Sequence, residues 1–310
     1  MNKYKDNIMV LYSGGMGSFL SAYMLWEKGY NILLYFNDTK YESKELYRFL
    51  LDTVDFFHDG DERYNEMMSI VYNLPELYED EEKRKSDLEQ LGYLMNERYS
   101  MFVYDSDGRG VWDVFDDRSF IGNSLVDPCS EELKRFRSRK FIQSLQGDWD
   151  IAIGIDWTES HRFDKAKPNW KPNDLIAPLI DANVDKLEYE ESVLSITGIQ
   201  KSLQYSKGFA HDNCGGMCVK AGLGHFKILH KNNIKLYRWH EQKLEDAMND
   251  IGRHPFLRKT VKGERYYVTL REYRQFLETG NLVVDGKTII KNENLDEYEE
   301  LEMGGCGCAI

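Results

Sequence analysis

The sequence lacks long apolar runs and an excess of positive charge, and each shortage excludes a class of protein. No apolar stretch among the 310 residues is long enough to cross a membrane or to form the core of a signal peptide, so we expect a cytoplasmic protein. Lys and Arg number 40 against 53 Asp and Glu, which gives a formal net charge of −13. Binding a long nucleic acid needs clustered cations, so we expect no general nucleic-acid binding; a local basic pocket for a small anion stays open.

Cysteine is also scarce, and its five copies are an odd number. They occur as Cys129, the pair Cys214/Cys218 and the pair Cys306/Cys308. In a cytoplasmic chain this pattern disfavours a disulfide framework. It favours metal, cluster or thiol chemistry, or simple burial of the thiols.

Cys214 and Cys218 flank a flexible Gly-Gly-Met turn, which can direct both sulfurs at one point. Zinc or an iron–sulfur cluster needs such convergence, and Cys129 is a candidate third ligand. For zinc, His211 or His225 would complete the set. In the alternative, the glycines form a second anion-binding turn and the cysteines only pack. Lys220, just beyond, is a candidate phosphate contact in either case.

The most informative stretch is the turn Ser13-Gly14-Gly15-Met16-Gly17-Ser18. An apolar run, 8–11, predicts a buried strand before it, and helical spacing of apolar residues resumes over 19–26. Unpaired N–H groups at a helix start favour an anion, and glycines let phosphate oxygens approach. The alternative is a tight turn with no ligand.

The turn is the first of several strand–loop–helix units. A second strand over 31–36 and a helix over 43–57 predict a Rossmann-like α/β fold, with a doubly wound, mainly parallel sheet that binds ligands beyond the carboxyl ends of its strands. Further strands are expected near 101–104 and 150–155. Asp156, Glu159, His161 and Arg162 follow the last of these, so they are candidates for contacts with a metal, phosphates or substrate.

We expect a nucleotide-binding domain over residues 1–205 with a solvated helical insertion at 59–100. A smaller, mostly helical extension over 206–310 carries the Cys-Gly-Gly-Met-Cys and Gly-Gly-Cys-Gly-Cys motifs. Helices are expected over 193–205, over 221–250 and from Thr269, and a hairpin over 282–290 around Asp-Gly. Prolines between 168 and 178 favour an extended crossover.

Three segments resemble one family. The turn at 13–18 resembles the SGGxDS loop of the PP-loop, or adenine nucleotide alpha hydrolase-like, superfamily, with Gly17 in place of the usual Asp. Residues 36–42 resemble the F-x-D-T-G-x-E segment of PAPS reductases, and 129–134 resemble their C-[ST]-x-x-L-K motif. The series resembles an often phage-encoded PAPS-reductase-like family over nearly the full chain, which implies the cytosol of a bacterium or phage-infected host.

This resemblance implies an ATP-binding enzyme that cleaves between the α- and β-phosphates and adenylates an acceptor that the sequence does not name. Asp38 and Thr39 would lie beside the ribose and base. Lys134, Arg162 or Lys220 would offset developing charge, and Mg²⁺ would bridge the phosphates, held by Asp38 or Asp156.

Two other functions stay open. One is sulfur transfer or sulfonucleotide reduction, for which family analogy implies a [4Fe–4S] cluster on Cys129, Cys214 and Cys218. The other is nucleotide binding or sequestration without turnover, which Gly17 favours. A homo-oligomer is also open.

Overall fold

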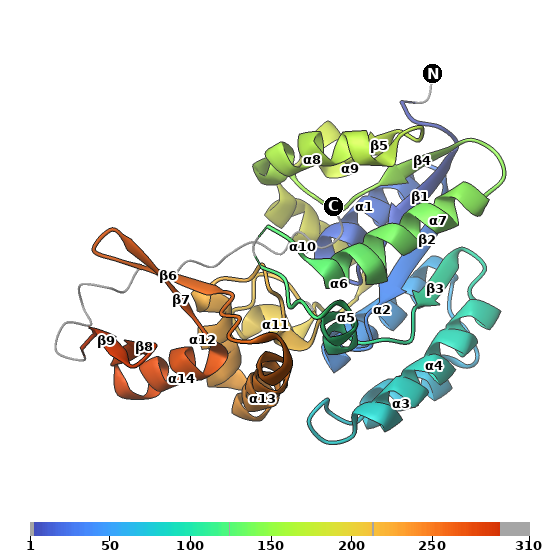
Figure 1. Ribbon diagram of the computed structural model, residues 1–310. Helices are drawn as coiled ribbons and strands as arrows, with labels where there is room; N and C mark the ends of the chain where they lie inside the picture. The colour runs from blue at the N-terminus through green and yellow to red at the C-terminus, as the bar shows by residue number, and fades with distance from the viewer. Residues whose placement is uncertain (1–2, 124, 213, 292–310) are drawn as a thin grey trace.

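The computed structural model describes residues 3–123, 125–212 and 214–291, and the expected motif at Cys306 and Cys308 lies outside them. A five-stranded, all-parallel sheet forms the centre of the first part of the chain (Figure 1). Its strand order is β3-β2-β1-β4-β5. The strands are β1 (Asn7–Leu11), β2 (Asn31–Asp38), β3 (Phe102–Ser106), β4 (Trp149–Ala152) and β5 (Leu175–Ile176). The expected Rossmann-like α/β fold is confirmed.

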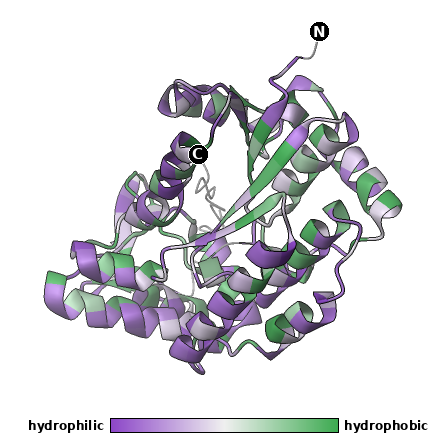
Figure 2. Cartoon of the chain, turned by 90° about the vertical axis from the view of Figure 1, so that its right-hand side faces the viewer, coloured by the Kyte–Doolittle hydropathy of each residue, from purple (hydrophilic) through white to green (hydrophobic). Residues whose placement is uncertain are grey.

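Both faces of the sheet are covered, as its apolar strands require. In β1, Ile8 and Val10 belong to the core on one face, while Met9 and Leu11 belong to the core on the other. The strands are accordingly among the most hydrophobic segments of the chain (Figure 2). The first core takes in residues of α1 (Met16–Glu27), α2 (Lys44–Phe57), α3 (Tyr64–Asn73), α4 (Glu81–Arg98) and α10 (Lys186–Thr197). The second takes in residues of α7 (Arg137–Ser144) and α8 (Ser160–Ala166).

The stretch 59–100 is helical as expected, but its charge run is only partly solvated. Arg84 in α4 is 2% exposed and donates hydrogen bonds to the backbone carbonyls of Lys40, Pro75 and Glu42. The expectation that the charges of this insertion are solvated was therefore wrong at Arg84. Arg84 fixes the loop between β2 and α2, and that loop contributes to the pocket described below.

The C-terminal unit packs around a core of its own. It contains α12 (Leu223–Asn232), α13 (Ile234–Ile251), α14 (Leu270–Thr279) and two hairpins, β6–β7 (Leu257–Val261, Glu264–Val268) and β8–β9 (Leu282–Val284, Lys287–Ile290). Figure 1 shows this unit beside the sheet. Its core also takes in Trp112 and Phe115 of α5 (Val111–Arg118), so an earlier segment joins the two parts.

Several element boundaries differ from expectation. The helix expected over 193–205 is α10, which ends at Thr197 with Gly198 as its C-cap, followed by α11 (Leu203–Ser206). The helix expected over 221–250 is two helices, separated at Asn233, whose side chain accepts the Leu236 N–H as an N-cap. The hairpin β6–β7 was missed. The proline segment holds two short helices, η3 (Lys167–Trp170) and α9 (Pro178–Asp181), because proline is tolerated in a first turn. The helix expected from Thr269 is α14, which Thr269 caps, and the Asp-Gly hairpin is confirmed.

We expect Arg84→Met to lower the free energy of unfolding by about 2–4 kcal/mol, because three backbone carbonyls lose a charged donor in a buried place. Urea unfolding would measure it. Lys83→Met is the matched control, since the Lys83 side chain is 57% exposed and its pairing with Asp87 is worth at most about 0.5 kcal/mol. Equal effects of the two substitutions would show that Arg84 does not hold the loop.

Candidate functional site

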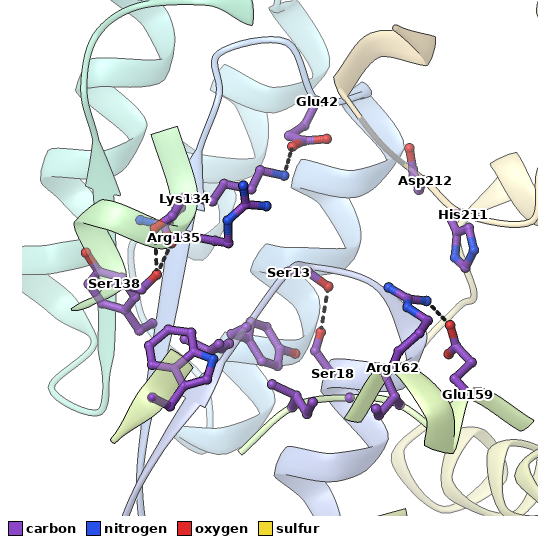
Figure 3. Close-up of a pocket in the computed structure, with 18 residues that line it drawn as sticks. Ser13, Ser18, Glu42, Lys134, Arg135, Ser138, Glu159, Arg162, His211 and Asp212 are labelled. Atoms are coloured by element: carbon purple, nitrogen blue, oxygen red, sulfur yellow. Dashed lines mark hydrogen bonds and ion pairs between the residues drawn. The ribbon is translucent and has the colours of Figure 1, made fainter. Parts of the chain in front are cut away.

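A pocket opens at the carboxyl ends of β1, β2 and β4. The chain leaves β1 for β2 on one side and later returns to β4 on the other, so this is the topological switch point at which such sheets bind ligands. Figure 3 shows side chains from several elements around it. The polar lining includes Ser13, Ser18, Glu42, Lys134, Arg162 and Asp212.

Ser13 and Ser18, at the two ends of the glycine-rich turn, line this pocket, whereas Gly14, Gly15, Met16 and Gly17 are not part of the lining. Gly14 has a φ of +72°, a conformation that favours glycine, and Gly15 precedes the first residue of α1. Ser18 Oγ donates to the Gly15 carbonyl at 2.8 Å and lies 3.2 Å from Ser13 Oγ. The N–H groups of Gly17 and Ser18 have no acceptor within the described ranges. The start of α1 therefore offers donors and a positive helix end to an anion.

Gly17 has a packing reason to lack a side chain. A Cβ at Gly17 would overlap the carbonyl oxygen of Gly154, and a Cβ at Gly154 would overlap the backbone of Gly17 and Ser18. The first turn of α1 thus touches the loop after β4, backbone against backbone. The carboxylate that the PP-loop motif carries at this position has no room here.

Lys134 reaches the pocket from a π-helix, η1 (Glu131–Phe136), a local widening that is frequent at functional sites. Its Nζ lies 3.2 Å from Oε1 of Glu42 and 3.8 Å from the sulfur of Cys214. Glu42 is 2% exposed, and its Oε2 accepts the Cys214 N–H at 2.6 Å. A buried carboxylate thereby links Lys134 to the cysteine turn.

Arg162 also lines the pocket and forms an ion pair with Glu159, another lining residue. Lys220, by contrast, does not line it. Lys220 Nζ lies 3.0 Å from Oδ2 of Asp127, and Arg135 pairs with the same carboxylate. Burial by itself would raise the pKa of Asp127, but these two cations hold it below its ordinary value.

Asp38, Thr39 and Asp156 also lie outside the pocket lining. Asp38 is 1% exposed and accepts hydroxyl hydrogen bonds from Tyr47 at 2.6 Å and Tyr104 at 2.7 Å. Thr39 is equally buried and donates to Glu42. Asp156 caps the short helix η2 (Trp157–Glu159) and pairs with Lys186 at 2.9 Å. The structure thus places Ser13, Ser18, Lys134 and Arg162 together and puts these three residues elsewhere.

Sequence reasoning missed Asp212. Its Oδ2 accepts hydrogen bonds from Ser43 Oγ at 2.9 Å and Ser202 Oγ at 2.8 Å, while no donor within the described part of the chain reaches Oδ1. Burial is the largest cause that raises the pKa of Asp212 to about 6; the negative charges of Glu42 and Glu45 act in the same direction, and the two serines oppose them. No sequence pattern marks this residue beyond its place next to the cysteine motif.

The cysteines do not form a metal site among the residues that the structure describes. Cys214 and Cys218 are each 5% exposed in the core of the C-terminal unit, and Cys129 packs at its edge. No group of three His, Cys, Asp or Glu side chains that could hold a metal occurs over 3–123, 125–212 and 214–291. His225, a candidate zinc ligand, lies 2.8 Å from the Gly216 carbonyl through Nε2.

The charges that line the pocket are balanced. Three cations face three carboxylates: Lys134, Arg135 and Arg162 against Glu42, Glu159 and Asp212. An anion entering the pocket therefore competes with these carboxylates for the cations. Protonation of Asp212 would tip the balance toward anion binding.

Comparison with protein-family models found no matching family, and comparisons with curated proteins and with solved structures found no match either. Within the described residues, no helix is both long and apolar enough to span a membrane. The fold is therefore established by the structure alone, as a Rossmann-like α/β sheet with a candidate anion site at its switch point.

We expect Gly17→Ala to lower the free energy of unfolding by about 1–3 kcal/mol, because the added methyl group forces two backbone segments apart. Gly154→Ala tests the same contact from its other side. Gly15→Ala is the matched control, since a Cβ at Gly15 meets only ordinary contacts of 3.4 Å or more. If Gly17→Ala were as stable as Gly15→Ala in thermal and urea unfolding, the loop after β4 would not be held against α1.

We expect the stability advantage of the wild type over Asp212→Asn to fall as pH rises from 4 to 6. Folding raises the pKa of this carboxyl group to about 6, so the folded state holds the proton more tightly than the unfolded state does. Ionisation of the group therefore lowers the free energy of unfolding. The expected change in the difference is on the order of 1–3 kcal/mol. Urea unfolding at several pH values measures it.

Taking the difference removes the effect of His240, which acts in the opposite direction. Burial lowers the pKa of His240 to about 4. The free energy of unfolding therefore falls as pH decreases below about 6.5, because the folded state disfavours the protonated ring. A difference between wild type and Asp212→Asn that does not vary with pH would mean that Asp212 titrates as an ordinary carboxyl group.

Proposed function

We propose that the chain binds an adenine nucleotide, ATP or a close relative, in the switch-point pocket and cleaves the bond between its α- and β-phosphates. The adenylyl group passes to an acceptor. One observation carries the proposal: Ser13 and Ser18, at the two ends of the glycine-rich turn that starts a 12-residue helix, line one pocket together with Lys134 and Arg162. A helix start combined with fixed cations is the usual solution for phosphate recognition.

The choice of adenine and of the bond cleaved comes from the resemblance to PP-loop proteins. The turn at 13–18 and the segment at 36–42 carry it, and the second segment supplies Glu42 to the pocket wall. We therefore propose that the Rossmann-like sheet belongs to the PP-loop type, close to the PAPS-reductase-like proteins.

In the proposed reaction the protein acts by position and charge. The N–H groups of Gly17 and Ser18 hold the departing pyrophosphate at the positive end of α1. Lys134 and Arg162, while paired with Glu42 and Glu159, face the same phosphates and offset the negative charge that develops there. Such fixed donors cost no reorganisation during the reaction and supply most of its stabilisation.

Magnesium is implied by the same resemblance, but the carboxylates expected to hold it do not fit. Asp38 is occupied by two tyrosine hydroxyls and Lys40 in the core, and Asp156 by Thr158 and Lys186. Position 17 has no room for a carboxylate. We therefore derive no step through a metal ion, and none through a cluster on the cysteines.

We expect Lys134→Met and Arg162→Gln each to weaken ATP binding by about 10–100-fold, because each removes a charge-assisted contact worth roughly 1.5–3 kcal/mol. Titration calorimetry with ATP and with pyrophosphate measures this. Lys140→Met is the control, since Lys140 is an exposed cation of α7 that does not line the pocket.

The wild-type protein and both variants are then incubated with ATP and a mixture of candidate acceptors, and the release of AMP and pyrophosphate is measured. Binding of ATP by wild type with unchanged affinity in both variants would rule out this pocket. Tight binding without pyrophosphate release would support nucleotide sequestration instead of transfer.

A further inference from the structure

A second cavity lies between the sheet and the C-terminal unit. Its walls come from the loop between β2 and α2, from residues 76–77 before α4, and from residues 204–236 around α11 and α12. Cavities where two structural units meet are common ligand sites. The phosphate chemistry proposed above does not use this one.

The two cavities share a wall. Glu42, His211 and Asp212 line both of them. In Figure 3, Asp212 and His211 lie on the opposite side of the first pocket from Ser138, and Glu42 lies at the top beside Lys134. A molecule in the second cavity is therefore one layer of side chains away from the phosphate site.

The second cavity combines an apolar surface with an excess of carboxylates. Leu77, Phe209, Leu229 and Leu236 supply the apolar part. Four carboxylates, Glu42, Glu45, Glu76 and Asp212, stand against three cations, Lys44, Lys207 and Arg84. The guanidinium of Arg84 is already bound to backbone carbonyls. Glu42, Glu45 and Glu76 are paired with Lys134, Arg48 and Lys44, so Asp212 is the carboxylate that decides which charge is accepted here. This lining suits an apolar molecule that is neutral or positively charged better than one that carries a carboxylate.

Asp212 has the arrangement of a proton acceptor in this shared wall. Ser43 and Ser202 hold its Oδ2 from two different elements, which fixes the orientation of the side chain. Oδ1 has no donor from the described residues, so it is available to a ligand. The residue lies in both linings and can touch a molecule that approaches from either side.

We propose that the second cavity holds the acceptor of the adenylyl transfer, and that this acceptor is an uncharged or cationic small molecule which reacts through a hydroxyl or amide group with Asp212 as the proton acceptor. This inference rests on the function proposed above. The acceptor oxygen forms a bond to the α-phosphorus, the bond from that phosphorus to the bridging oxygen breaks, and pyrophosphate leaves with the electron pair. The proton of the hydroxyl or amide group passes to Oδ1 of Asp212. A carboxylate acceptor would need no proton acceptor.

The test uses four probes that share one apolar ring: benzamide, benzyl alcohol, benzylamine and benzoate. Their binding to the full chain at pH 7.5 is measured by ligand-observed NMR, with and without α,β-methylene-ATP, which cannot be cleaved. We expect benzamide and benzyl alcohol to bind at least 10-fold more tightly than benzoate. We also expect interligand NOEs between benzamide and the bound nucleotide analogue.

Three variants test where the probes bind and which charge they meet. Asn232 is an exposed residue at the rim of the second cavity only, so Asn232→Trp should weaken benzamide at least 10-fold and leave the nucleotide analogue unaffected. Lys231→Trp, on the same helix outside the lining, should change neither. Asp212→Asn should raise the affinity for benzoate relative to benzamide at least 5-fold, because it removes the nearest negative charge.

The two proposals fail separately. If α,β-methylene-ATP does not bind, the nucleotide function is wrong, whatever the probes do. If the analogue binds but benzoate is preferred, or Asn232→Trp leaves benzamide unaffected, the second cavity does not take the acceptor class proposed here. An unchanged benzoate-to-benzamide ratio in Asp212→Asn, or absent interligand NOEs, would overturn the role of Asp212.

Discussion

The arrangement of the site depends on one buried carboxylate, that of Glu42. A charge with 2% exposure is tolerated only when it is paired and hydrogen-bonded, because removal from water is costly. Its partners are the ammonium group of Lys134, the backbone N–H of Cys214 and the hydroxyl of Thr39. They come from the π-helix, the C-terminal unit and the β2–α2 loop. Satisfying one charge therefore brings three distant segments of the chain together beside the phosphate turn.

The turn at 214–216 takes its shape from backbone requirements. Cys214, Gly215 and Gly216 all have positive φ, and the carbonyls of the two glycines lie within hydrogen-bond distance of the ring nitrogens of His240 and His225. His240 accepts the Trp112 N–H on its other nitrogen, so it is a neutral ring that bridges α5 and the turn. These glycines and histidines thus have structural roles, although their spacing resembles a metal motif.

The fold could be predicted from the sequence because its signals are local. Short apolar runs, the glycine turn and the capping residue Thr269 each act within a few residues of chain. The site was harder to predict, because the path of the backbone decides which side chains reach the pocket. Asp38 ends β2 and Glu42 lies four residues later, yet Asp38 points into the core and Glu42 reaches the pocket. Arg84 lies within the charged run 79–85, and nothing in the sequence distinguishes this buried residue from its charged neighbours. Asp212 is identified only by its hydrogen bonds to the serines that cap α2 and α11.

The contact between Gly17 and Gly154 has a consequence for how this protein can diverge. A side chain at position 17 would overlap the backbone of Gly154, and a side chain at position 154 would overlap the backbone of Gly17. Neither position can therefore gain a side chain while the other segment keeps its present path. The two sites must change together. A chain with the usual Asp in the first turn of this helix needs a displaced loop after its fourth strand, and a pair of glycines at these two positions would identify chains that share the tighter arrangement. Such a pair could sort related sequences into two groups before any of their activities is measured.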